Sequence, residues 1–102
     1  MDIIKYLFRT NGTYFGFIYE GNIFSRDGAY LGWIEGKYVW DADGNFRGEL
    51  CEEKFILRNQ LVIPASSRTP KLRPVMPPLP NPPPNIPPYS PPIGYTEAFV
   101  NI

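Results

Sequence analysis

Acidic side chains are the densest group in this chain that could do chemistry, and five of them stand close together: Asp41, Asp43, Glu49, Glu52 and Glu53. Neighbouring carboxylates serve as general acids and bases, or as ligands of hard cations. Asp43 precedes a glycine, as a turn residue does, and the segment lacks the Asp-x-Asp-x-Asp-Gly pattern and distal Glu of a calcium loop. We therefore interpret the five carboxylates as solvated charges of turns and connections.

Histidine and thiol chemistry are equally poorly supported. The sequence has no histidine, which removes the usual general base, the Ser-His triads and the imidazole metal sites. The one cysteine, Cys51, has no histidine to activate it, and a single cysteine excludes an internal disulfide. The sequence accordingly predicts a protein that is not an enzyme, with no catalytic, cofactor or metal site.

Charge and hydropathy argue against nucleic-acid partners and against a membrane span. Ten basic and ten acidic residues give a net charge of zero, whereas nucleic-acid binding needs a basic excess. No apolar run reaches the roughly 20 residues of a membrane helix, and the first residues, MDIIKYLFRTNG, are typical of a strand and not of a signal peptide. These features predict no nucleic-acid partner, no membrane span and a cytoplasmic location.

One phrase recurs along the first half of the chain: NGTYFG, DGAYLG and DGNFRG. Its turn pairs begin at Asn11, Asp27 and Asp43, which are 16 residues apart. Extending this period in both directions gives four copies, and Gln60 and Pro64 replace the two glycines in the fourth copy. A terminal repeat with atypical residues is what a cap requires.

Each copy is predicted to form one β-hairpin. Asn-Gly and Asp-Gly supply the positive φ angles of tight hairpin turns, and arms rich in Val, Ile and aromatic residues flank them. A second set of turns joins the copies: Tyr19-Glu20-Gly21-Asn22, Glu35-Gly36-Lys37 and Cys51-Glu52-Glu53-Lys54. Eight short strands result, about two from each copy. The fourth copy, FILRNQLVIPAS, is expected to contribute the last of them, and Pro64 to end the sheet.

Glycines at equivalent positions predict how the hairpins come together. They occupy the turns and the middles of the second arms: Gly12, Gly16, Gly28, Gly32, Gly44 and Gly48. The mid-strand glycines alternate with bulky apolar positions on one face, which indicates that backbones converge there. The expected fold of residues 1–66 is therefore all-β, with four antiparallel hairpins around a pseudo-four-fold axis.

Residues 67–102 are predicted to form a second unit of different character. All 13 prolines lie between Pro64 and Pro92, a composition that favours an extended polyproline II tail without internal hydrogen bonds. The tail ends in an apolar and aromatic patch, GYTEAFVNI, which is costly to leave in water. We predict that the tail docks through four residues: Tyr89, Tyr95, Phe99 and Val100.

The repeated phrase is an Asn-Gly or Asp-Gly pair followed by any residue, an aromatic residue, any residue and glycine. This pattern resembles the four-fold beta flower domain of uncharacterised bacterial proteins. The resemblance covers residues 1 to about 66, and proline-rich carboxy-terminal segments accompany the domain in that family. The 16-residue period differs from the longer period of MORN-type modules. The resemblance implies a fold and no activity, because the family has no established function.

Alternation along the second arms predicts one apolar strip: Phe15, Phe17, Leu31 and Trp33. Copy three has Arg47 and Glu49 at the equivalent positions. An isolated surface would carry charges throughout, so we expect something to cover the strip. In order of preference, the cover is the chain's own tail, a second protomer or a ligand. The tail comes first because polyproline segments dock into aromatic-lined grooves.

The function predicted from these features is a non-enzymatic structural or protein-interaction module, with the tail docking on the β domain or on a partner. The alternative is a small-ligand or carbohydrate-binding module that uses surface aromatics such as Trp33 and Trp40. A hydrolase based on the carboxylates is a third hypothesis, and it has no supporting motif.

Overall fold

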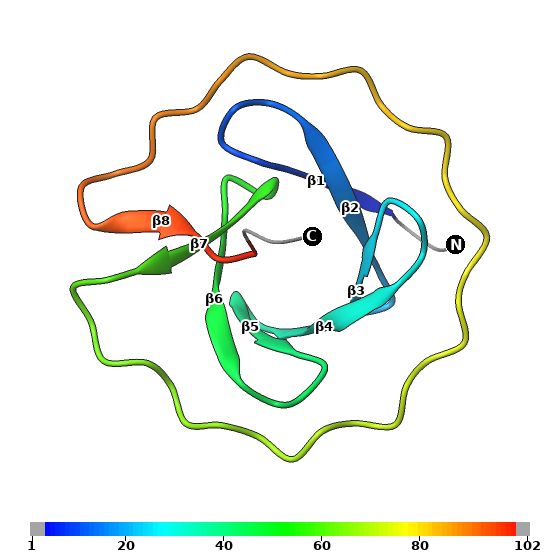
Figure 1. Ribbon diagram of the computed structural model, residues 1–102, viewed down its shortest axis with the longest axis horizontal. Helices are drawn as coiled ribbons and strands as arrows, with labels where there is room; N and C mark the ends of the chain where they lie inside the picture. Colours follow the sequence, from blue (N-terminus) through cyan, green and yellow to red (C-terminus); the bar gives the residue numbers. More distant parts are fainter. Residues whose placement is uncertain (1–3, 100–102) are drawn as a thin grey trace.

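The structure is a computed structural model that describes residues 4–99. Within them the chain is all-β and has no helix, so none is present that could cross a membrane. Eight strands form one antiparallel sheet, in which they follow one another in chain order. Their bounds are β1 Lys5–Phe8, β2 Tyr14–Tyr19, β3 Asn22–Ser25, β4 Tyr30–Glu35, β5 Tyr38–Asp41, β6 Phe46–Cys51, β7 Phe55–Asn59 and β8 Tyr95–Glu97. The sheet curls around a centre (Figure 1).

Turn chemistry explains the hairpins locally. Gly12 and Gly44 have φ angles of 92° and 86°, in the left-handed region that ordinary side chains avoid. Glu52 and Glu53 also adopt positive φ, at 54° and 59°, and the Lys54 N–H donates to the Cys51 carbonyl at 3.1 Å. Both the predicted Asn-Gly and Asp-Gly turns and the predicted turn at residues 51–54 are therefore confirmed.

Three β-bulges at equivalent places in the repeat explain why the sheet curls. The register shifts between Leu7 and Phe8, and the same shift recurs at the equivalent positions of the second and third copies. Each shift leaves one extra residue on the facing strand: Phe15, Leu31 and Arg47. A bulge bends its strand and increases the local twist, so three equivalent bulges turn a flat ladder into a curved one.

The eighth strand does not come from where the sequence predicted it. Residues 62–66 form no strand, and Tyr95–Glu97 pairs with β7 instead, with Asn59 opposite Tyr95. Pro64 has no N–H to contribute to a ladder, and the glycine that would open a tight turn is replaced by Gln60. The chain therefore leaves the sheet after β7 and returns much later to complete it.

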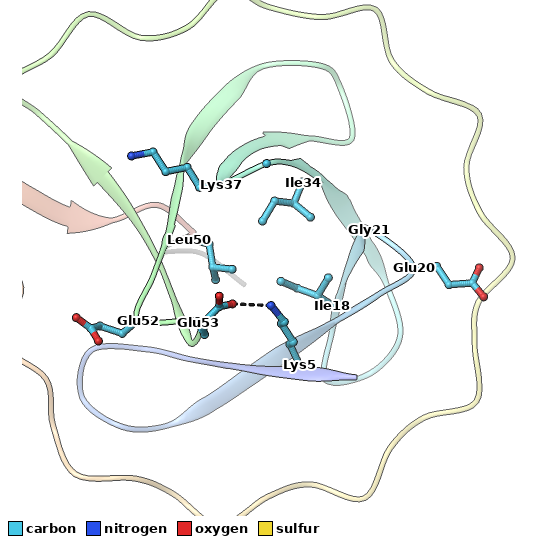
Figure 2. Close-up of a pocket in the computed structure, with 10 residues that line it drawn as sticks. Lys5, Ile18, Glu20, Gly21, Ile34, Lys37, Leu50, Glu52 and Glu53 are labelled. Atoms are coloured by element: carbon cyan, nitrogen blue, oxygen red, sulfur yellow. Dashed lines mark hydrogen bonds and ion pairs between the residues drawn. The ribbon is translucent and has the colours of Figure 1, made fainter. Parts of the chain in front are cut away.

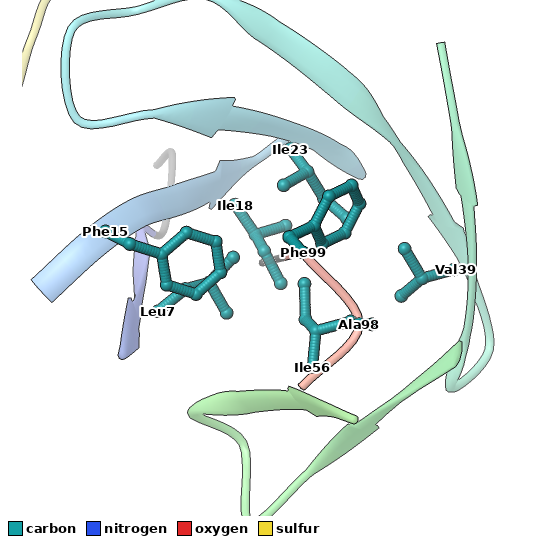
Figure 3. Packing of buried hydrophobic residues seen from close by; sticks show 8 residues of the cluster. All are labelled: Leu7, Phe15, Ile18, Ile23, Val39, Ile56, Ala98 and Phe99. Atoms are coloured by element: carbon teal, nitrogen blue, oxygen red, sulfur yellow. The ribbon is translucent and has the colours of Figure 1, made fainter. Parts of the chain in front are cut away.

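Apolar side chains on the concave face form the inner cluster, which is drawn in Figure 3: Leu7, Phe15, Ile18, Ile23, Val39, Ile56, Ala98 and Phe99. Ala98 and Phe99 follow β8 and enter this cluster from the end of the described chain. The Arg9 and Arg47 guanidinium groups hold them there by donating to the carbonyls of Phe99, at 2.6 Å, and Ala98, at 2.7 Å. The core is thus completed by residues distant in sequence.

The segment between β7 and β8, residues 60–94, runs around the outside of the sheet, and we call it the belt (Figure 1). Between Pro74 and Tyr89 its burial has a period of three. Six positions of this stretch are buried or partly buried, and the two residues after each of the first five are exposed: Pro74, Pro77, Pro80, Pro83, Ile86 and Tyr89. Pro91 and Gly94, nearer β8, are also partly buried. One side of the belt therefore lies against the sheet.

Candidate binding sites

The structure separates the four residues of the predicted apolar strip. Phe15 packs in the inner cluster, whereas the Phe17 ring stacks on Phe24 with centroids 5.4 Å apart. Leu31 packs against the inner cluster, and Trp33 stacks on Trp40 at 6.3 Å. The expectation of one shared face was wrong because Phe15 and Leu31 are themselves the extra residues of the bulges, which breaks the alternation with Phe17 and Trp33.

Aromatic rings on the convex face lie against the belt, and cations from the belt sit over them. Arg68 lies over the Trp40 ring at 4.3 Å, and Lys71 over the Trp33 ring at 5.0 Å. Arg73 lies over Tyr30 at 5.7 Å. Cation–π contacts contribute roughly 0.5–2 kcal/mol each, depending on desolvation. Sequence reasoning missed these residues, although a signal existed, because they are the three Lys and Arg residues that follow Pro64.

Main-chain groups of the belt also bond to the hairpin turns. The Arg68 N–H donates to the Gly44 carbonyl at 2.7 Å, and the Ile86 N–H donates to the Gly12 carbonyl at 3.0 Å. The residue midway between them in sequence is Pro77, which has no N–H. At the corresponding turn, side chains of the belt fill the space, since a Cβ added at Gly28 would meet the Met76 sulfur at 2.5 Å.

The four predicted docking residues have different surroundings. Tyr89 stacks on Phe55 with ring centroids 4.5 Å apart, and its N–H donates to the Thr10 carbonyl at 2.7 Å. Tyr95 begins β8, and Phe99 lies in the inner cluster. Val100 lies outside the described residues.

The mid-strand glycines do not converge on one another, which corrects the prediction. A Cβ at Gly32 would meet the backbone of the following strand, with the Asp41 Cα at 2.7 Å and the Trp40 carbonyl carbon at 2.9 Å. A Cβ at Gly16 or Gly48 would likewise meet the backbone of its neighbouring strand. These glycines therefore allow close approach of adjacent strands at the bulges, and not contact across an axis.

A cavity of about 710 Å³ opens where the turns between copies meet (Figure 2). Three apolar side chains from equivalent positions of the repeat point toward one another in it: Ile18, Ile34 and Leu50. Beside them the Lys5 ammonium pairs with the Glu53 carboxylate at 2.5 Å. Glu20 and Glu52 line the rim and point away (Figure 2). The cavity is therefore suited to an apolar group.

Strained turns border this cavity. Among residues 4–99, the non-glycine residues with positive φ are three glutamates of the cavity rim: Glu20, Glu52 and Glu53. A left-handed conformation costs a non-glycine residue roughly 1–2 kcal/mol.

A family model described as the 4-fold beta flower protein matches residues 2–98. The chain belongs to the 4-fold beta flower family. The match includes the belt and β8, so the family relationship extends beyond the residue 66 that the resemblance had covered. No curated protein and no solved structure matches the chain significantly. The function of the beta flower family is unknown, so membership establishes a fold and no activity.

Acidic residues of this beta flower sheet differ in their surroundings. Asp41 caps a turn, because its Oδ1 accepts hydrogen bonds from the N–H groups of Asp43 and Asn45 at 2.9 and 3.0 Å. Two of the five carboxylates are not solvated charges as predicted. The Asp41 side chain is 15% exposed and pairs with Arg47 at 3.5 Å, and the Glu49 side chain is 14% exposed and pairs with Lys37 at 3.4 Å. Within residues 4–99 no three His, Cys, Asp or Glu side chains are grouped as metal ligands.

Cys51 of the beta flower sheet is partly buried at the end of β6. Burial, followed by the negative charge of Glu49, raises the pKa of its thiol. The thiol is therefore protonated at neutral pH, whereas the thiolate is the nucleophilic form.

Proposed function

We propose that this beta flower protein is a non-enzymatic structural and protein-interaction module whose sheet binds a proline-rich segment, here its own belt. The observation that carries the proposal is the set of three hydrogen bonds from belt N–H groups to hairpin carbonyls: Arg68 to Gly44, Ile86 to Gly12, and Tyr89 to Thr10. Main-chain bonds of this kind contribute about 1 kcal/mol each and orient an extended segment.

The belt is proposed to be a polyproline II helix. Such a helix repeats after every third residue, which accounts for the period of three in the belt's burial. Arg68 and Ile86, which both bond to hairpin turns, are separated by a whole number of such helical turns. Polyproline stiffness reduces the entropy lost on docking, because the free segment already populates the bound conformation.

We further propose that the sheet is a four-fold repeat in which β8 supplies the last arm. The regular recurrence of the turns, glycines and bulges supports three complete copies. The pairing of β7 with β8 supports a fourth copy interrupted by the belt. The division of the chain into two units at residue 66 stays a prediction. If β8 completes the fourth copy, residues 95–99 belong to the repeat domain and not to the tail.

A protein partner would meet the side of the belt that faces water. Leu72 and Val75 are 98% and 91% exposed, and such side chains on a fixed polyproline segment are available to an aromatic-lined groove. The same belt bound to a second protomer would produce a homo-oligomer.

Belt removal tests the proposal directly. Asn59 and Tyr95 are paired across β7 and β8, so an Asn-Gly turn can replace residues 60–94 and close a tight hairpin. This belt-deleted protein is expected to keep its β-sheet circular dichroism spectrum and to bind a fluorescent peptide of residues 60–94. A matched peptide with Arg68, Lys71 and Arg73 changed to Gln should bind at least tenfold more weakly, because it lacks the cation–π contacts. A folded belt-deleted protein without affinity for the native peptide would contradict the proposal.

Binding of a small apolar molecule in the central cavity is a second candidate function. Its support is the cavity of about 710 Å³ with a floor of Ile18, Ile34 and Leu50, a size typical of ligand sites. The carbohydrate version has less support, because Trp33 and Trp40 are 1% and 3% exposed and present no free ring face. Fluorescence titration with anilinonaphthalene sulfonate tests the cavity. Leu50→Arg should abolish the signal, and an unchanged titration would exclude the cavity as the binding site.

A further inference from the structure

One position of the repeat is aromatic in the first two copies and acidic in the third. Phe17 and Trp33 occupy equivalent places on the convex face, and their rings are 0% and 1% exposed. Phe17 lies between Tyr6 and Phe24 in the register, and Trp33 between Asn22 and Trp40. The equivalent residue of the third copy is Glu49, which lies between Tyr38 and Leu57.

A carboxylate does not fill the volume of an aromatic ring, and a second cavity of about 220 Å³ lies at this place. Its walls include two aromatic rings in contact with each other, Tyr38 and Phe46, with centroids 6.0 Å apart. Three further groups come from β7, the belt and β8: Arg58, Val62 and Tyr95. The cavity therefore lies where Glu49 stands in place of the aromatic residue that the first two copies have, Phe17 and Trp33.

Charges around the cavity are unequal. The Glu49 carboxylate is engaged by the Lys37 ammonium at 3.4 Å and by the Tyr95 hydroxyl, and these contacts raise the pKa of both partners. Arg58 is the second cation, and its guanidinium lies 5.4 Å from the centroid of Phe46. One of its nitrogens, Nη1, donates to the Asn59 carbonyl at 2.8 Å. A guanidinium has five N–H donors, so Arg58 keeps donors for a ligand. Lys37 and Arg58 are two cations against the single Glu49 carboxylate, so the cavity carries one excess positive charge.

We propose that this cavity binds a small planar carboxylate, with its ring against Tyr38 and Phe46 and its carboxylate on Arg58. A guanidinium forms bidentate, charge-assisted hydrogen bonds with a carboxylate, and the aromatic walls accept a flat apolar body. The cavity volume restricts the ligand to about the size of benzoate. The belt supplies one wall residue, Val62, and Lys37 lines both cavities. The proposed ligand contacts, Tyr38, Phe46 and Arg58, all lie on the sheet, so the site does not depend on the function proposed above.

The experiment titrates benzoate into the full-length chain and monitors its binding by two-dimensional ¹H–¹⁵N nuclear magnetic resonance. Saturable shifts are expected at Tyr38, Phe46, Arg58 and Tyr95. Benzamide has the same shape without the charge, and it should bind at least tenfold more weakly because it lacks the charge-assisted bonds. Equal affinities for the two probes, or no benzoate shifts at these residues, would overturn the proposal.

Two variants identify the site by different means. Glu49→Phe restores the aromatic residue of the other copies, so the cavity fills and benzoate binding should be lost while the spectrum stays dispersed. Arg58→Gln keeps the cavity and removes the proposed anion partner, with an expected loss of tenfold or more. Lys5→Gln is the matched control, because Lys5 lines the other cavity, and it should not change benzoate affinity. Benzoate binding that is unchanged in a folded Arg58→Gln variant contradicts the assignment even if Glu49→Phe does not fold.

Discussion

Single residues of this beta flower protein have roles that follow from what lies immediately beside them. A glycine is required in mid-strand because the next strand's backbone occupies the place of its Cβ. Glu49 lines a cavity at the position where the first two copies have an aromatic residue. Two buried hydroxyls, those of Tyr14 and the half-buried Tyr30, have no hydrogen-bond partner among the described residues.

Gly32→Val is expected to destabilise the sheet by about 2–4 kcal/mol, because its side chain would overlap the backbone of β5 near Trp40 and Asp41. Urea denaturation followed by circular dichroism measures this loss. Gly36→Asn is the control, since Gly36 has open space around it and a φ of 63° that asparagine tolerates. A midpoint for Gly32→Val that equals the wild-type value would show that the close approach is unimportant.

The free energy of unfolding should decline in alkali. Burial raises the pKa values of Tyr14 and Tyr30, each against a lowering effect of a nearby Arg. Below their ordinary pKa of about 10, both hydroxyls are neutral in the folded and unfolded chains, so they cause no pH dependence. As pH rises through about 10, the unfolded chain ionises first, and stability falls until the folded-state pKa is passed.

A series of urea midpoints from pH 7 to above pH 10 checks this prediction. Tyr14→Phe/Tyr30→Phe should lose less stability in alkali than the wild type, because both contributions are absent. At pH 7 the double variant should be neutral or slightly stabilised, since it removes two buried hydroxyls without described partners. Identical pH profiles would refute the assignment to these tyrosines.

At the scale of elements, the belt contacts hairpin turns that lie far from it in the sequence. The belt follows the hairpin turns in reverse chain order, from Gly44 past Gly28 to Gly12. It passes from one turn to the next without forming strands of its own. Arg68 and Ile86 donate main-chain hydrogen bonds to the turns at Gly44 and Gly12. Beside Pro77, which has no N–H, the Met76 side chain packs against the turn at Gly28 instead.

Ile86→Pro tests the role of these bonds. Proline suits an extended segment but removes the N–H that donates to Gly12. The belt amides nearby, including Tyr89, should exchange with deuterium about five- to tenfold faster, as expected from the loss of about 1 kcal/mol. Ile86→Val retains the N–H and a similar side chain, and it should exchange nearly as the wild type. Equal exchange in all three proteins would mean that this hydrogen bond does not hold the belt.

At the scale of the whole molecule, residues 60–99 pack against both faces of the sheet. The belt covers aromatic rings on the convex face, while Ala98 and Phe99 fill the concave face. β8 also pairs with β7, and the Glu97 carboxylate accepts from the Thr10 N–H at 3.1 Å, next to the first hairpin turn. β8 and its Glu97 thereby link the last strands of the sheet to the turn after β1.

Truncation to residues 1–66 should therefore be severe. The variant lacks the belt, β8 and two core side chains, and the tryptophans that Arg68 and Lys71 cover would meet water. We expect red-shifted tryptophan emission, binding of a hydrophobic dye and aggregation. The belt-deleted protein, which keeps β8 and Phe99, should remain folded by comparison. A monomeric 1–66 chain with native tryptophan emission would show that residues 67–102 are a free linker.

The amino-acid sequence by itself determined the all-β class, the period of the repeat and the turns, because these depend on local chemistry. An Asp-Gly or Asn-Gly pair needs no distant partner to favour a hairpin, and prolines confined after residue 63 mark where strands cannot continue.

Tertiary structure alone decided which faces the side chains share and what completes the sheet. The bulges at Phe15 and Leu31 exist only relative to a paired strand, so simple alternation assigned those residues wrongly. The pairing of Leu57 with Glu97 joins positions that lie far apart in the sequence, on either side of the belt, and no local pattern specifies such a partner. Turn formation is a local property of the chain. Strand register, and the packing of the belt and of Phe99 on the sheet, depend on contacts that form only when distant segments meet.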